Sequence, residues 1–221
     1  TAPIVAPVTI CEGSTATLTV SSNTTNTFRW YDSATAERQL FEGYSFETAP
    51  LDETVTYYVE AVNPNGCGSS ERRPVTVTVN KRIERNTLTV AAAPICAGQR
   101  PEIISGTEPT GGNGSYTYLW QKSDQGPDEG FTTIEGATSA SYQPEALQED
   151  TWFRRVVTSG PCAAHTSAAV KVTVLPAISN NSIAVEKATI CAGDVLQTIK
   201  GTTPAGGNGS YTYLWESSRD G

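Results

Sequence analysis

The chain has 221 residues, a formal net charge of −8 and no methionine. The acidic balance argues against a nucleic-acid-binding protein, which needs a basic surface to neutralise phosphates. The length allows two small domains and part of a third. The complete absence of Met indicates an internal segment or a processed product. No apolar run is long enough for a transmembrane helix, so no direct membrane insertion is expected in this segment.

Short segments of alternating polarity predict β-strands along the chain. They are rich in β-branched residues and are separated by Gly, Pro and Asn, which is typical of an all-β protein. In the first part of the chain the predicted strands are Pro3–Ile10, Thr15–Val20, a segment around Phe28 and Trp30, Gln39–Gly43, Tyr44–Ala49, Thr54–Val62 and Pro74–Val79. About seven short strands predict a sandwich of two sheets, of the immunoglobulin-like kind.

The same pattern returns further along the chain. The motif Ile-Cys-x-Gly occurs at Ile10–Gly13, Ile95–Gly98 and Ile190–Gly193. The ten residues GGNGSYTYLW occur at Gly111–Trp120 and again, 95 residues later, at Gly206–Trp215. Such self-similarity indicates tandem domains. We predict an immunoglobulin-like domain over 1–82, a second domain over 83–177, and the start of a third repeat, similar to the second, over 178–221.

The glycine-rich half of the duplicated stretch is a candidate tip loop. It consists of Gly111, Gly112, Asn113, Gly114 and Ser115, and the first repeat is five residues shorter at this point. No Gly-Lys-Ser/Thr follows, so this is not a Walker-type phosphate-binding loop. Gly and Asn favour a turn with positive φ. A binding loop at the end of the sandwich is the alternative, because variable immunoglobulin domains bind there.

The tryptophans are candidate core residues. Trp30, Trp120 and Trp215 fall on the third predicted strand of each repeat, where immunoglobulin-like sandwiches place a buried Trp. On the sixth strand the expected core residues are Tyr58 and Trp152, with their neighbours Tyr57 and Phe153 as alternatives. A sugar-stacking platform is the alternative role for the tryptophans.

Five cysteines suggest a disulfide framework in an oxidising compartment. One pair per domain would join Cys11 to Cys67 and Cys96 to Cys162, leaving Cys191 without its partner. However, Cys11 precedes the second strand and Cys67 follows the sixth, so the two could lie a strand length apart. A staple between domains, Cys11 with Cys162, is therefore the alternative.

Nothing in the sequence indicates catalysis or a cofactor. His165 is the only histidine and has no motif around it. The adjacent carboxylates Asp52–Glu53, Asp128–Glu129 and Glu149–Asp150 lie in turn-like segments, and neighbours on a strand point to opposite faces. Without an Asp-x-Asp-x-Asp-Gly loop, a calcium site has little support. We expect no enzyme activity, no metal and no cofactor.

The segments ICEGSTATLTV, FRWYDS and ETVTYYVEAVNPNGC resemble the immunoglobulin-like repeats of large surface proteins in the Bacteroidetes. The second repeat is similar to the polycystic-kidney-disease-like repeats of the same adhesins. This resemblance implies type IX secretion, association with gliding motility, a cell-surface location and the role of a stalk or adhesive module. Asp32-Ser33-Ala34 resembles the O-glycan acceptor of such proteins, which makes Ser33 a candidate glycosylation site.

The expected partners are neighbouring repeats of the same chain, with a surface polysaccharide or protein as a further ligand. The segment NKRIERN (Asn80–Asn86) is expected to be a short linker between the domains. Two other functions stay open. One is a carbohydrate-binding or spacer module of a secreted hydrolase, and the other is a subunit of an extracellular filament or sheath.

Overall fold

The computed structural model describes residues 3–21, 25–69, 71–186, 189–195 and 197–219, and within these it contains strands and no helix. The chain divides into two compact units. Unit 1 consists of Thr1–Asn86, Thr107–Tyr118 and Val156–Thr166. Unit 2 consists of Thr87–Gly106, Leu119–Arg155 and Ser167–Gly221. The division runs through two strands, β13 (Thr117–Ser123) and β15 (Thr151–Thr158), which contribute residues to both units.

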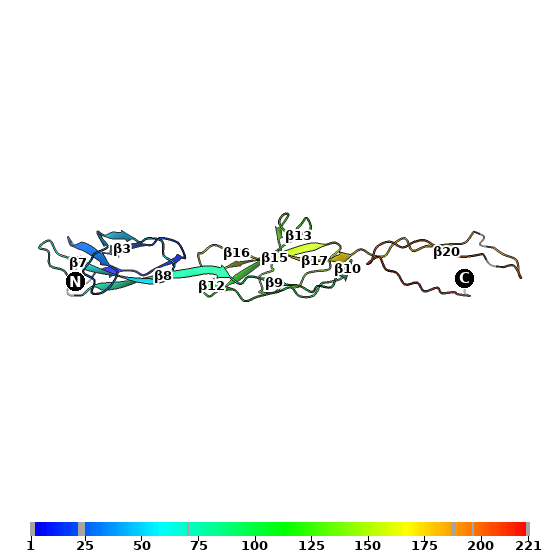
Figure 1. Ribbon diagram of the computed structural model, residues 1–221, viewed down its shortest axis with the longest axis horizontal. Helices are drawn as coiled ribbons and strands as arrows, with labels where there is room; N and C mark the ends of the chain where they lie inside the picture. Colours follow the sequence, from blue (N-terminus) through cyan, green and yellow to red (C-terminus); the bar gives the residue numbers. More distant parts are fainter. Residues whose placement is uncertain (1–2, 22–24, 70, 187–188, 196, 220–221) are drawn as a thin grey trace. The chain divides into compact units, whose positions relative to one another are not determined.

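Unit 1 is built around two sheets (Figure 1). Its strands are β1 (Ile4–Val5), β2 (Val8–Cys11), β3 (Thr17–Ser21), β4 (Thr27–Tyr31), β5 (Phe41–Glu42), β6 (Ser45–Glu47), β7 (Val55–Val62), β8 (Arg73–Glu84), β12 (Thr110–Gly112) and β16 (His165–Thr166). One sheet has the order β1-β3-β6, and the other has the order β12-β8-β7-β4-β5 with β2 also paired to β8. The opening segment therefore changes sheets, because β1 joins the first sheet and β2 joins the second.

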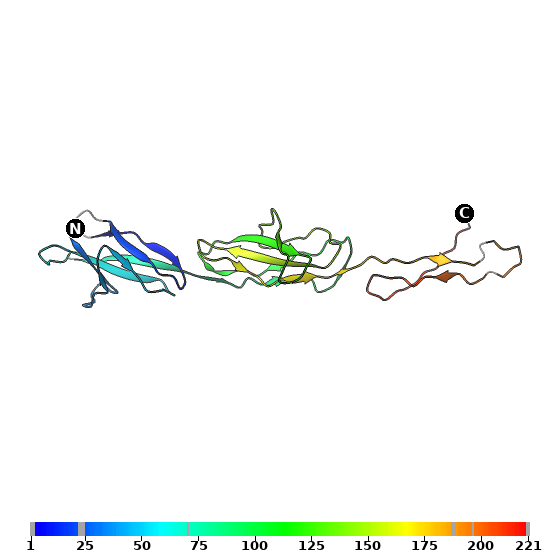
Figure 2. The ribbon, with the colours of Figure 1, turned by 90° about the horizontal axis from the view of Figure 1, so that it is seen from above.

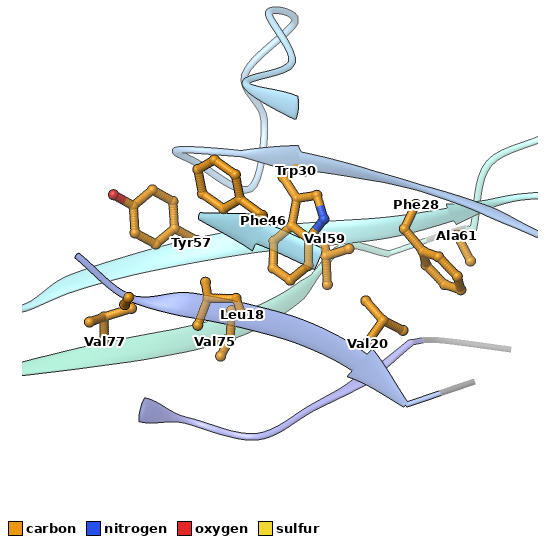
Figure 3. Close-up of a cluster of buried hydrophobic side chains, with 11 residues drawn as sticks. Leu18, Val20, Phe28, Trp30, Phe46, Tyr57, Val59, Ala61, Val75 and Val77 are labelled. Atoms are coloured by element: carbon orange, nitrogen blue, oxygen red, sulfur yellow. The ribbon is translucent and has the colours of Figure 1, made fainter. Parts of the chain in front are cut away.

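The core of unit 1 lies between these sheets (Figure 3). Leu18 and Val20 alternate with exposed threonines on β3, so the polar alternation of the sequence becomes an inner and an outer face. The Trp30 side chain is fully buried, and its indole N–H donates to the Gly43 carbonyl at 3.0 Å. Phe46 packs against Trp30, with ring centroids 5.6 Å apart. This arrangement satisfies the one polar atom of the Trp while its rings exclude water.

The last strand of the first repeat, β8, is twelve residues long and continues past the sandwich core. Its first half pairs with β7, its middle with β2, and its final residues with β12 (Figure 2). The period-two burial of Val75, Val77 and Val79 continues to Ile83. The segment Asn80–Glu84 is therefore a hydrogen-bonded strand, which corrects the expectation of a short linker over Asn80–Asn86.

Unit 2 repeats the sandwich with shorter ladders. Its other strands are β9 (Leu88–Thr89), β10 (Ile95–Cys96), β11 (Ser105–Gly106), β14 (Thr132–Thr133), β17 (Val170–Val172), β18 (Val174–Leu175), β19 (Ile183–Ala184) and β20 (Lys200–Gly201). β10 pairs in parallel with β18, as β2 does with β8. Trp120 is fully buried with Phe153 and Ile104, and its indole N–H donates to the Ser139 carbonyl at 2.8 Å.

The strand predicted as the sixth of each repeat is β7 in the first repeat and β15 in the second, and it corrects two of the expected core residues. In β7 the buried positions include Tyr57 and Val59, whereas Tyr58 is only half-buried. In β15 the buried positions include Phe153, whereas Trp152 is half-buried. The two strands thus use opposite faces at positions 95 residues apart. A shift of one residue moves a whole strand's side chains to the other face, and the repeat spacing alone does not reveal it.

The expectation that the third tryptophan, Trp215, is a core residue is also corrected. Trp215 is 56% exposed, and Leu214 beside it is 85% exposed. Trp30 and Trp120 are covered by residues of a sixth strand, β7 or β15. Between residues 178 and 219, as far as they are described, the only ladder is the two-residue pairing of β19 with β20. No strand equivalent to β7 or β15 covers Trp215 there.

The order of the strands in the two sheets is that of an immunoglobulin-like sandwich, and so is the passage of the opening segment from one sheet at β1 to the other at β2. The all-β, immunoglobulin-like fold predicted from the strand pattern is confirmed. Among the described residues, no helix is long and apolar enough to cross a membrane.

Candidate functional site

The candidate site is the junction where the first repeat meets the second, inside unit 1. Cys11 at the end of β2 forms a disulfide with Cys162, which lies in the loop after β15. Their Cα atoms are 5.6 Å apart, although 151 residues separate them in sequence. The bond therefore joins the end of β2 in the first repeat to a loop of the second repeat. The free cysteines of the described chain are Cys67, Cys96 and Cys191, all exposed.

This pairing corrects the expectation of one disulfide per domain. Cys11 lies opposite Asn80 on β8, whereas Cys67 follows β7, whose end lies beside the beginning of β8 at Arg73. Seven residues of extended strand span about 23 Å, far beyond the roughly 7 Å that a disulfide allows between Cα atoms. The staple between repeats, raised as the alternative, is the bond that the structure contains.

The candidate tip loop lies against the end of β8. β12 pairs antiparallel with β8, with Thr110 opposite Glu84 and Gly112 opposite Lys81. Gly111 has φ +84°, and a methyl group added there would overlap the Arg82 carbonyl. The Tyr116 hydroxyl donates to the Gly111 carbonyl at 2.8 Å. Gly111 is thus required by its close contact with the backbone of the first repeat, and Gly112 by its close contact with the Ser159 side chain.

The remaining loop residues are fixed by polar contacts and face solvent. The Asn113 N–H donates to the Ser159 hydroxyl at 2.9 Å, and that hydroxyl donates back to the Asn113 side-chain oxygen at 2.9 Å. The same side-chain oxygen accepts the Ser115 N–H at 2.9 Å. Asn113, Gly114 and Ser115 are exposed, so only this half of the loop presents a surface to a ligand.

We expect Gly111→Ala to lower the free energy of unfolding by about 2–4 kcal/mol. A side chain in the left-handed region costs about 1–2 kcal/mol, and the overlap with the Arg82 carbonyl adds strain. Gly114→Ala is the matched control, because Gly114 also has φ +84° but has no atom within 4 Å of an added methyl. It should cost about 1–2 kcal/mol. Urea unfolding of both variants checks this, and equal losses would contradict the contact.

Charged groups surround the disulfide on the first-repeat side. Glu12 accepts from the Arg82 backbone N–H at 3.2 Å and from the Lys81 ammonium at 3.2 Å. Lys81 also donates to Glu53 at 2.6 Å and to the Asp52 carbonyl at 2.7 Å. The Arg82 hydrogen bond, followed by that of Lys81, holds the pKa of Glu12 below its usual value. The hydrogen bond that Lys81 donates to Glu53 raises the pKa of Lys81.

The lowered pKa of Glu12 predicts a pH-dependent contribution to stability. A carboxylate with a depressed folded-state pKa stabilises the fold above its ordinary pKa of 4.5 and loses this effect as the pH falls through the folded value. Wild type should therefore be more stable than Glu12→Gln near neutral pH, and the difference should shrink below pH 4.5. Urea unfolding across this range measures it. A difference that stays constant with pH would contradict the ionised contact.

The second-repeat side is held by further hydrogen bonds. The Asn86 side-chain amide donates to the His165 carbonyl at 2.9 Å, and Asn86 is buried. The Thr107 hydroxyl donates to the Arg85 carbonyl. A groove of about 520 Å³ follows the disulfide; it is lined by Cys11, Glu12, Asn80, Lys81, Arg82, Ile83, Glu84, Cys162, Ala163, Ala164 and His165. The groove is open and bordered by paired charges.

The candidate catalytic groups serve as structural or surface residues. The His165 side chain is exposed on β16. Asp150 accepts from Lys171 at 2.6 Å and from the Val174 N–H at 2.8 Å, and these bonds lower its pKa. In the described part of the chain, no group of three His, Cys, Asp or Glu residues is placed to hold a metal ion.

Ser33 lies in an ordered turn. Its hydroxyl accepts the Ala36 N–H at 2.9 Å, and its carbonyl accepts from Arg72 at 3.2 Å. The Arg72 guanidinium lies 3.3 Å from the Tyr31 ring centroid and pairs with Glu60 at 3.7 Å. Ser33 is half-buried. Its modification stays a prediction, which the mass of the Ser33 peptide from native material would test.

Sequence reasoning missed the contacts of Glu12, Lys81 and Arg82 because it treated Asn80–Asn86 as a linker. A signal was present, since Ile83 continues the period-two pattern of Val75, Val77 and Val79. The partner role of Ser159 for the Asn113 loop carried no recognisable sequence signal.

Two family models match the chain. Residues 1–80 match "Ig-like domain CHU_C associated", and residues 85–176 match "Domain of unknown function (DUF8696)". Neither description names an enzymatic activity. The first repeat is therefore similar to an immunoglobulin-like family, in agreement with its sheet order. A comparison with curated proteins finds no match.

Solved structures with similar folds include domains of titin, with 14% identity and a TM-score of 0.48 over 76% of this chain and 62% of that one. Extracellular domains 3–5 of Drosophila OTK match with 11% identity and a TM-score of 0.44, covering 77% of this chain and 59% of that one. Fibronectin(III)-like modules of Clostridium thermocellum CbhA match with 14% identity and a TM-score of 0.37, covering 77% and 89%. The chain thus spans about 60% of the length of the first two.

Proposed function

We propose that this segment is a non-catalytic, stiffened spacer in the stalk of a larger secreted or cell-surface adhesin. The observation that carries the proposal is the junction inside unit 1. There the strand β8 runs without interruption from the first sandwich into its pairing with β12. The Cys11–Cys162 disulfide joins the first and second repeats by a second, covalent link. A stalk needs joints that resist bending, and two separate restraints on one joint provide this.

Local sequence also favours a stiff joint. Flexible linkers are rich in Gly and Ser and leave their backbone groups free. By contrast, the Asn80–Glu84 segment is paired with β2 and β12 and carries the ion pairs of Lys81 and Arg82 with Glu12. Bending at this point would break backbone hydrogen bonds and strain a covalent bond.

The proposed location is extracellular. Disulfides persist in oxidising compartments and are rare in the cytosol. The similarity of residues 1–80 to an immunoglobulin-like family supports the same location, since such domains are common on cell surfaces. The expected partners are adjoining repeats of the same chain, with a polysaccharide or protein ligand held elsewhere in the adhesin.

Pulling single molecules by their ends tests the spacer function. The disulfide shields 151 residues from extension, which corresponds to about 540 Å of contour length at about 3.6 Å per residue. In oxidising buffer this length should stay hidden at forces that extend the rest of the chain, and a reductant should release it. Release of the full length in oxidising buffer would overturn the proposal of a load-bearing joint.

A carbohydrate-binding module is the second candidate, because the first repeat exposes two aromatic side chains. Phe41 is 43% exposed and Tyr44 is 46% exposed. Each also packs on a core ring, Phe41 on Phe46 and Tyr44 on Phe28, which supports a packing role. Glycan-array binding that is lost in the variant Phe41→Ala/Tyr44→Ala would favour the carbohydrate-binding module over the spacer.

A further inference from the structure

The glycine turn of this junction occurs a second time, inside unit 2. Gly206 and Gly207 have φ +86° and +58°, against +84° and +61° at Gly111 and Gly112. A methyl group added at Gly206 would overlap the Ala177 carbonyl, just as one at Gly111 would overlap that of Arg82. Ala177 lies 95 residues after Arg82, so the same contact occurs at equivalent positions of the two repeats.

The hydrogen bond that closes this turn is repeated as well. The Tyr211 hydroxyl donates to the Gly206 carbonyl at 2.7 Å, matching the 2.8 Å bond from Tyr116 to Gly111. The Gly207 N–H also donates to the Pro176 carbonyl at 2.8 Å. The duplicated glycine turn is therefore a docking element, which attaches the second and third repeats to the end of the repeat before them.

Cys96 occupies in the second repeat the place that Cys11 occupies in the first. Cys11 lies opposite Asn80 in a parallel pair, and Cys96 lies opposite Leu175 in a parallel pair. The next N–H donates to the carbonyl of that partner in both cases, at 2.9 Å from Glu12 and at 2.9 Å from Ala97. Cys96 thus presents an exposed thiol at the same point of its sheet.

The late cysteines are equivalent in the same way. Cys67 follows the sixth strand of the first repeat, and Cys162 follows that of the second, 95 residues later. Cys162 bonds to the early cysteine of the preceding repeat. Cys67 is exposed, with its N–H bound to the Asn63 side chain at 2.9 Å.

We propose that the cysteines form a ladder, in which the Ile-Cys-x-Gly cysteine of each repeat bonds to the late cysteine of the repeat that follows. The bond Cys11–Cys162 is one rung. Cys96 is the half-site for the next rung, with the late cysteine of the third repeat, expected 95 residues after Cys162. Cys67 is the half-site toward a preceding repeat. This inference stands on the junction geometry and does not depend on the spacer function.

The chemistry of each rung is thiol–disulfide exchange. Forming the S–S bond removes two protons and two electrons from the two thiols, and a disulfide donor such as glutathione disulfide accepts them and becomes two thiols. The Cys96 thiolate attacks one sulfur of the donor, and the second cysteine then displaces the remaining donor thiol. Both steps need an accessible sulfur, which the exposure of Cys96 provides.

Disulfide mapping of a longer polypeptide tests the ladder. The chain would be extended along its natural reading frame through the late cysteine of the third repeat, oxidised with glutathione disulfide, digested without reductant and analysed by mass spectrometry. The expected result is a cross-linked peptide that joins Cys96 to that cysteine, together with the Cys11–Cys162 peptide. A free Cys96 thiol, its linkage to Cys67 or Cys162, or a reading frame without the late cysteine would overturn the ladder.

The variant Cys11→Ala in the same polypeptide is a second test. The ladder predicts that Cys162 becomes a free thiol, while the bond of Cys96 to the third repeat is unchanged. Re-pairing of Cys162 with Cys96 would instead show that the bonds follow proximity within a repeat, which overturns the ladder. Neither outcome depends on whether the segment acts as a stalk.

Discussion

Replacing both Cys11 and Cys162 with alanine should lower the free energy of unfolding by about 5 kcal/mol. The disulfide closes a loop of 151 residues, and closing so long a loop removes much entropy from the unfolded chain. In the chain-entropy treatment a 100-residue loop already contributes about 4.7 kcal/mol. Urea unfolding of the wild type and the double variant, both without reductant, measures the difference.

The chain supplies a matched control for this prediction. Cys67 and Cys96 are exposed free thiols, so Cys67→Ala/Cys96→Ala removes two cysteines and leaves the bond intact. Its free energy of unfolding should stay within about 0.5 kcal/mol of the wild type, as is usual for surface substitutions. A large loss in this control, or none in Cys11→Ala/Cys162→Ala, would contradict the assignment of the stabilising disulfide.

Trp120→Ala should lower the free energy of unfolding by about 3–5 kcal/mol, the usual cost of removing a buried Trp. Trp120 is fully buried and packs against Tyr142, with ring centroids 5.5 Å apart. The substitution opens a cavity and also removes the indole N–H that the Ser139 carbonyl accepts. Thermal or urea unfolding followed by tryptophan fluorescence and by circular dichroism measures the loss.

Trp152→Ala is the control for the second tryptophan. Trp152 lies on the outer face of β15, half-buried, with the Lys171 ammonium 5.0 Å from its ring centroid. The loss should be about 1 kcal/mol, because little apolar surface is removed and no closed cavity forms. A loss as large as that of Trp120→Ala would mean that Trp152 belongs to the core.

The repeats, the all-β fold and the place of Trp30 and Trp120 could be predicted from the sequence. Each rests on local alternation of polarity and on repeated spacing, which the sandwich converts directly into inner and outer faces. The face of the sixth strand could not be predicted in this way. Adjacent aromatic residues, Tyr57–Tyr58 and Trp152–Phe153, offer either face, and only the pairing register decides between them.

The contacts of the junction between the repeats could not be predicted from the sequence for a different reason. Domain boundaries are expected in polar, charged segments, and Asn80–Asn86 has that composition. Here the charged residues instead form ion pairs on a continuing strand, so that Lys81 and Arg82 bind Glu12. Likewise, a cysteine spacing considered within one repeat favours pairs inside that repeat. In the structure β2 ends at Cys11 opposite Asn80 of β8, and Cys11 bonds there to Cys162 in a loop of the next repeat.

The glycine-rich turn gains a definite role from these contacts. Gly111 and Gly206 each lie against the carbonyl of a residue in the preceding repeat, Arg82 or Ala177. The turn is absent from the first repeat, between its first cysteine and Trp30. A turn that attaches one repeat to the previous one accounts for both its duplication and its glycines.

Disulfide mapping of the 221-residue chain tests the central claim most directly. Tryptic digestion without reductant should yield a cross-linked pair of the peptides 1–29 and 156–171, which carry Cys11 and Cys162. The peptides of Cys67 and Cys96 should react with a thiol label before reduction. A bond from Cys11 to Cys67, or from Cys96 to Cys162, would contradict the disulfide-pinned junction.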